Sequence, residues 1–134
     1  MERQDYVDLL IDHYENPRHR GPVQDATVVM SGGNPGCGDV VTLYVTVDPQ
    51  SERITDIHFE GDGCTISQAG VSLITEEMVG KTISEIEQTG YDVMIEMMGR
   101  DVVATRLRCA TLALSTLKAA AQKYRGTLLH VTQS

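Results

Sequence analysis

The chain has 134 residues and a formal net charge of −8, with 41% hydrophobic and 22% charged residues, which indicates a globular rather than a disordered protein. The acidic balance argues against a nucleic-acid partner, because a general nucleic-acid binder needs a basic surface against phosphate. Three cysteines cannot all pair within one chain, so the composition favours free thiols in a reducing compartment.

The beginning of the chain carries charges throughout and lacks the apolar core of a secretory signal peptide. No stretch approaches the roughly 20 apolar residues that span a bilayer. We therefore expect a cytoplasmic protein without a membrane partner. Since no repeat or linker divides the sequence, we also expect a single domain over residues 1–134.

The N-terminal half predicts one helix followed by three strands. Apolar residues recur at helical spacing from Tyr6 to Tyr14, and this helix should end before Pro17. His13, on its apolar side, is interpreted as a buried structural histidine rather than a ligand. The strands are expected at residues 26–30, 40–47 and 54–60, with a glycine-rich loop over residues 32–38. Consecutive strands joined by short turns are typical of an antiparallel meander.

The apolar period becomes helical after residue 61. Helices are expected at residues 66–79, 82–88, 91–98 and 105–124. Gly126 is expected to end the last helix. A helix, then strands, then further helices predicts an α+β fold, with a three-stranded antiparallel sheet and helices packed on one face.

The three cysteines fall at the ends of these predicted elements. Cys37 lies in the glycine-rich loop, Cys64 follows the third strand, and Cys109 lies near the start of the last helix. No CxxC pair is present, which argues against a zinc ribbon or a thioredoxin-type redox pair. Glycines beside the first two cysteines permit close backbone approach to a bound ion. These supporting glycines are Gly36, Gly38 and Gly63. Buried structural thiols and a shared thiolate site are both consistent with the spacing.

Asp39 favours the shared site, because it lies two residues beyond Cys37 and should point to the same side of an extended segment. Three thiolates and one carboxylate provide four ligands, enough for tetrahedral zinc or for iron. The competing interpretation of Asp39 is a turn residue that binds its own backbone. Arg106, Arg108 and the helix start should favour the Cys109 thiolate, although a solvated helix face would also explain both arginines.

Four segments resemble the U-type iron–sulfur cluster assembly proteins, namely IscU, SufU and the N-terminal domain of NifU. They are DHYENPR at 12–18, GNPGCGD at 33–39, FEGDGCTIS at 59–67 and RCATLA at 108–113. The resemblance runs from about residue 6 to about residue 124 and implies an IscU/SufU-like α+β fold with a three-stranded sheet. It also implies a metal site of Cys37, Asp39, Cys64 and Cys109.

The resemblance implies that this site accepts sulfur, as a persulfide, from a cysteine desulfurase, with Cys37 and Cys109 as candidate acceptors. The favoured reading is a scaffold that assembles a transient [2Fe-2S] cluster and transfers it to apo iron–sulfur acceptor proteins. The alternative is a zinc-dependent sulfurtransferase of the SufU type, which binds zinc and relays the sulfur. A module with a purely structural zinc is a third reading.

The sequence departs from both branches of this family. Arg108 stands where IscU members carry histidine, and an arginine cannot ligate a metal at neutral pH. Val102–Arg106 replaces the Leu-Pro-Pro-Val-Lys segment that a dedicated chaperone reads in IscU, so that contact is not carried over to this chain. The motifs around Cys64 and Cys109 are more similar to SufU, yet the usual SufU insertion between these cysteines is absent. The chain therefore resembles a short, SufU-leaning member.

Overall fold

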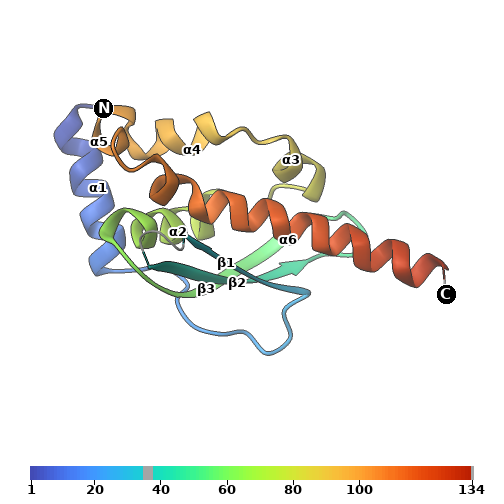
Figure 1. Cartoon of the computed structure of the whole chain (residues 1–134). Helices are drawn as coiled ribbons and strands as arrows, with labels where there is room; N and C mark the ends of the chain where they lie inside the picture. The colour runs from blue at the N-terminus through green and yellow to red at the C-terminus, as the bar shows by residue number, and fades with distance from the viewer. Residues whose placement is uncertain (35–37, 134) are drawn as a thin grey trace.

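The computed structural model describes residues 1–34 and 38–133, and Figure 1 shows a small sheet beneath a group of helices. The elements in chain order are α1 (Arg3–Glu15), β1 (Val28–Asn34), β2 (Asp39–Val47), β3 (Ile54–Asp62), α2 (Thr65–Glu77), α3 (Ile83–Gln88), α4 (Tyr91–Met98), α5 (Arg100–Val103) and α6 (Leu107–Gln133). This order confirms the predicted α+β class. Among the described residues, no helix combines the length and the apolar character needed to cross a membrane.

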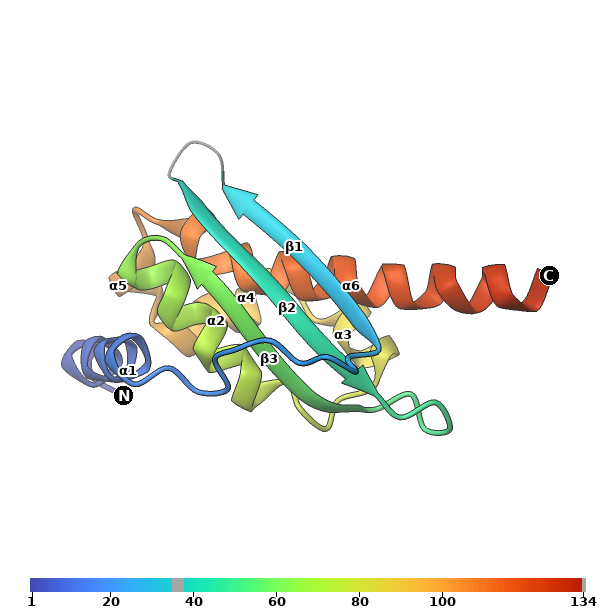
Figure 2. The same cartoon turned by 90° about the horizontal axis from the view of Figure 1, so that it is seen from below.

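The sheet is an antiparallel meander in the order β1-β2-β3. Buried residues alternate with more exposed ones along β2, as expected for a strand with one covered face. The helices lie on that covered side in Figure 1, which confirms the predicted packing on one face. The connection from α1 to β1, residues 16–27, passes across the other side in Figure 2, and backbone hydrogen bonds join His19 and Gly21 to Phe59 of β3.

Helices α2 and α6 form the layer that rests on the sheet. The central turns of α2, Ser67–Thr75, are buried all round, because the sheet, α1 and α6 surround this helix. In α6, the expected inward residues Leu112 and Leu117 are buried together with several alanines. A Cβ on Gly32 of β1 would lie only 2.1 Å from Thr116 Oγ1. Glycine at this position therefore sets how closely α6 approaches the sheet.

Strand β1 differs from its prediction. It begins at Val28 and runs through Gly32 and Gly33 to Asn34, where the sequence predicted a loop. Both glycines pair with β2, opposite Val41 and Val40. The low strand propensity of glycine is overridden here, since the missing side chain makes room for α6.

The expectation that Gly126 ends the last helix is wrong. Helix α6 begins at Leu107, two residues later than predicted, and continues to Gln133. One glycine inside a helix costs only about 1 kcal/mol, which is too little to end a long helix of good helix formers. The short helix α5, Arg100–Val103, has no counterpart among the predicted elements.

Because β1 and α6 approach each other closely at Gly32, we expect the stability of the protein to depend on this glycine. Replacement Gly32→Ala should lower the free energy of unfolding by about 2 kcal/mol, because the new methyl group forces the buried Thr116 and α6 away from the sheet. The matched control is Gly33→Ala, whose Cβ would meet its nearest atom, the Asp39 carbonyl oxygen, at an ordinary 3.4 Å. Urea unfolding of both variants tests this, and equal effects would contradict the assigned role of Gly32.

Candidate metal centre

Three of the predicted ligands converge at one end of the sheet. Asp39 begins β2, Cys64 immediately precedes α2, and Cys109 lies in the first turn of α6. Since β2 and β3 run antiparallel, the start of β2 lies beside the end of β3, from which the chain turns directly into α2 (Figure 2). The Asp39 carboxylate oxygen and the two Sγ atoms all lie within 4.8 Å of one another, so these three groups could hold a metal ion.

The carboxylate of Asp39 occupies the middle of this group. Asp39 is only 1% exposed. Its Oδ1 accepts the backbone N–H of Cys64 at 2.8 Å, and its Oδ2 lies 3.1 Å from Cys109 Sγ and 3.9 Å from Cys64 Sγ. Burial acts to raise the pKa of Asp39, but its hydrogen bonds together hold this pKa below the usual value. The group is therefore an anion that binds Cys64, 25 residues away, rather than its own turn.

Cys64 is the N-cap of α2, and its Sγ accepts the backbone N–H of Ser67 at 3.4 Å. The preceding Gly63 has a φ of +148°, which an L side chain rarely adopts. A Cβ on Gly63 would lie 2.3 Å from Asp39 Oδ1. Glycine at position 63 therefore lets the backbone pass close to the Asp39 carboxylate. Gly38 also has a left-handed φ, of +71°, immediately before Asp39.

The expectation that the surroundings favour a Cys109 thiolate is wrong for the metal-free chain. Cys109 is 2% exposed, and burial, followed by its hydrogen bond to Asp39, raises the pKa of its thiol to about 12. Arg106 and Arg108 are exposed, so solvent screens their charge, and neither makes an ion pair with any residue described in the structure. A bound cation would reverse this situation, because a coordinated thiol loses its proton.

The two arginines flank the approach to the centre. Arg106 and Arg108 line a hollow of about 330 Å³ beside Cys109. Arg106 also lines a second hollow, of about 210 Å³, beside Cys64. Of the remaining predicted site residues, Cys37 and Gly36 lie outside the described residues.

Ser67 also lies at the candidate centre, although it is not among the residues predicted from the sequence. Its hydroxyl lies 3.1 Å from the Cys64 carbonyl oxygen and also reaches the Asp39 carboxylate. Its position in the sequence could have indicated this, because Ser67 follows Cys64 by three residues. At the start of a helix, the third residue after the N-cap lies close to the N-cap side chain. His13, in contrast, behaves as predicted: it is buried, and its Nδ1 lies 2.8 Å from Ser72 Oγ.

The chain is similar to proteins of the NifU, IscU and SufU kind. The family described as "NifU-like N terminal domain" matches residues 5–130. The chain is 38% identical over 119 residues to the iron–sulfur cluster assembly scaffold protein IscU 1 of Archaeoglobus fulgidus, covering 89% of this chain and 76% of that protein. It is 31% identical to the zinc-dependent sulfurtransferase SufU of Bacillus subtilis, covering 90% of this chain and 92% of that protein. This second alignment spans 138 positions, more than the 134 residues present, so it opens gaps in this chain.

A solved structure agrees with these similarities. A putative iron–sulfur cluster assembly scaffold protein for the SUF system, from Fervidobacterium islandicum, superposes with a TM-score of 0.74 at 28% identity. The match covers 90% of this chain and 99% of that chain. The α+β fold with its three-stranded sheet is thus shared with a protein of this kind.

The raised pKa of Cys109 predicts how the metal-free centre titrates. Replacement Asp39→Asn removes the adjacent negative charge, so the Cys109 pKa should fall, and the thiolate fraction at a fixed pH should rise about tenfold for each unit of that fall. The ¹³Cβ chemical shift of Cys109 measured against pH reports this pKa without requiring access to the buried thiol. The control Asp62→Asn makes the same charge change on an exposed neighbour and should leave the titration in place, whereas identical titrations in both variants would contradict the coupling to Asp39.

Proposed function

This chain belongs to the family of NifU-like N-terminal domains, and on that premise we propose that it is an iron–sulfur cluster assembly scaffold. In this proposal it accepts sulfur from a cysteine desulfurase, assembles a transient [2Fe-2S] cluster and transfers the cluster to apo acceptor proteins. The observation that carries the proposal is the convergence of Asp39, Cys64 and Cys109 within 4.8 Å. The names of the relatives support the assembly role.

The donor set fits an iron–sulfur cargo. Two cysteine sulfurs and one ionised carboxylate lie together, and thiolates are the usual ligands of such clusters. We assign Cys37 as the further donor, because it lies two residues before Asp39 in the sequence. The carboxylate is a harder ligand than sulfur, so it should hold iron less firmly. Weaker holding suits a protein whose cluster is cargo and must leave.

We assign the sulfur-accepting role to Cys37 rather than Cys109. In the metal-free chain Cys109 is buried and protonated, whereas attack on a persulfide requires an accessible thiolate. In the proposed step the Cys37 thiolate attacks the outer sulfur of the desulfurase persulfide. The sulfur–sulfur bond of that persulfide breaks, a new persulfide forms on Cys37, and the desulfurase cysteine leaves as a thiolate.

A second candidate function is zinc-dependent relay of the same sulfur. It is favoured by the 31% identity to SufU and by Arg108, which replaces the histidine of IscU members. Three thiolates and one carboxylate also suit tetrahedral zinc. Both functions use the same residues and the same sulfur donor. They differ in the resident metal and in the form in which sulfur leaves.

Metal analysis combined with mass spectrometry for persulfide separates these functions. The chain is incubated anaerobically with iron, cysteine and a cysteine desulfurase. The scaffold function predicts a brown protein with visible absorption, bound iron and sulfide. Tight zinc, no cluster and faster desulfurase turnover would establish the relay function instead. Zinc whose loss unfolds the protein, with no persulfide on any cysteine, would overturn both and leave a structural zinc module.

The carboxylate ligand makes a specific kinetic prediction. Replacement Asp39→Ala removes the oxygen ligand, which should hold iron less firmly than sulfur does. The remaining sulfur ligands should then release the cluster less readily, so its transfer to an apo acceptor should become slower. Transfer is followed by the change in visible circular dichroism as the cluster moves between proteins. Asp62→Ala serves as the control, because it removes an exposed carboxylate from the end of the neighbouring strand β3. Transfer at the unchanged rate in Asp39→Ala would contradict this role of Asp39.

A further inference from the structure

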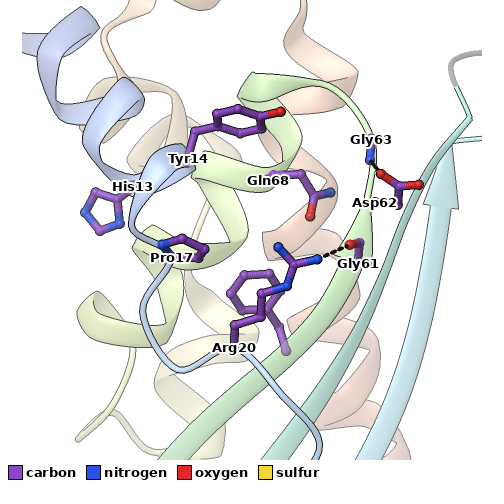
Figure 3. A pocket seen from close by; sticks show the side chains of 9 residues that line it. His13, Tyr14, Pro17, Arg20, Gly61, Asp62, Gly63 and Gln68 are labelled. Atoms are coloured by element: carbon purple, nitrogen blue, oxygen red, sulfur yellow. Dashed lines mark hydrogen bonds between the residues drawn. The ribbon is translucent and has the colours of Figure 1, made fainter.

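A second cavity lies beside the candidate metal centre and uses none of its donors. It has a volume of about 230 Å³ and lies between the end of α1, the segment that follows it, the end of β3 and the first turns of α2 (Figure 3). The lining residues are His13, Tyr14, Pro17, Arg20, Phe59, Gly61, Asp62, Gly63 and Gln68. Polar groups and two aromatic rings therefore face the same small space.

Gln68 places an unused hydrogen-bond acceptor in this cavity. The residue is only 9% exposed, and its side-chain Nε2 lies 3.4 Å from Ser67 Oγ. Its Oε1 has no hydrogen-bond partner among the residues that the structure describes. Figure 3 shows this amide directed into the space above Arg20 and Gly61. A buried carbonyl oxygen without a partner is unfavourable, so a ligand that brings an N–H donor would satisfy it.

Arg20 supplies a positive charge to the same cavity. One of its terminal nitrogens donates to the Gly61 carbonyl oxygen at 3.2 Å. It makes no ion pair with an acidic residue in the described parts of the chain, although acidic residues outnumber basic ones in this protein. Its remaining N–H groups can therefore bind an anion.

The two groups lie within the reach of one small ligand. Arg20 contacts the Gly61 carbonyl oxygen, and Gln68 Oε1 lies 3.1 Å from the position of a Cβ built on Gly61. The Asp62 carboxylate also lines the cavity. A phosphate offers only oxygens, which would face both Asp62 and the Gln68 carbonyl. A carboxylate with an N–H group on the neighbouring carbon matches the cation and the acceptor together.

From this arrangement we propose that the cavity binds the α-amino carboxylate unit of an amino acid. The carboxylate binds Arg20, and the N–H group donates to Gln68 Oε1. The unit comes either from a free amino acid or from the last residue of a peptide, which carries an amide N–H beside its carboxylate. The volume suits one small residue, with Tyr14 and Phe59 available to its side chain. The proposal is independent of the cluster assembly function, because no metal donor takes part.

Titration of the full chain, as purified, with three small probes tests this site by ¹H–¹⁵N NMR. L-alanine represents the free amino acid, N-acetyl-L-alanine represents a peptide C-terminus, and L-alaninamide lacks the carboxylate. Saturable shifts of Gly61, Gly63 and the Gln68 side-chain amide are expected with at least one carboxylate probe, with a dissociation constant of about 1 mM. Binding of L-alanine alone would identify a free amino acid as the ligand, and binding of N-acetyl-L-alanine would identify a peptide end.

Two arginine variants complete the test. Arg20→Gln should weaken binding about tenfold or more, because it removes the charge that holds the carboxylate. Arg3→Gln makes the same change on an exposed arginine outside the cavity and should bind like the unmodified chain. Thermal unfolding of each variant checks that the fold is retained. Saturation by neither carboxylate, equal binding of L-alaninamide, or undiminished binding by folded Arg20→Gln would each overturn the proposal.

Discussion

The hydrogen bond between the Asp39 carboxylate and the backbone N–H of Cys64 is the constraint on which the candidate centre depends. A buried carboxylate is stable only when hydrogen bonds or charges compensate it. Asp39 finds that compensation at the start of α2 and in the thiol of Cys109 on α6. One side chain at the start of a strand thus connects three elements, and the same contact assembles the donors of the centre.

Two glycines, Gly63 and Gly32, allow the close contacts that bring Asp39, Cys64 and Cys109 together. Gly63 allows the chain to pass directly beside the Asp39 oxygen, where any side chain would collide with the carboxylate. Gly32 allows α6 to approach the sheet closely. Since Cys109 lies in the first turn of α6, the distance between helix and sheet also affects where its sulfur lies relative to Asp39. The positions of the three groups are thus set by how closely these elements pack.

Much of the fold could be predicted from the sequence, because the apolar period changes clearly from strands to helices after residue 61. The errors arise where the role of a residue depends on distant parts of the chain. Gly32 resembles a loop residue in the sequence, whereas its use in the sheet depends on Thr116, far along the chain. The motifs selected Asp39, Cys64 and Cys109, which the structure brings together, but they predicted a Cys109 thiolate, whereas burial and Asp39 raise the pKa of this thiol. The pKa of this thiol depends on its burial on the inner side of α6 and on a carboxylate 70 residues away, and a local sequence pattern contains neither.

The separation of the donors along the sequence has a consequence for biosynthesis. Asp39 and Cys64 lie 25 residues apart and meet once β2, β3 and the start of α2 have formed, whereas Cys109 joins them across 70 residues. A ribosome releases the chain from its N-terminus, so the sheet can form before α6 emerges. Until α6 docks, the Cys109 sulfur is missing from this group, so any metal ion that these residues hold would be bound more weakly in the nascent chain than in the finished protein. Tight binding of a metal ion would then require that the last helix, α6, has packed against the sheet.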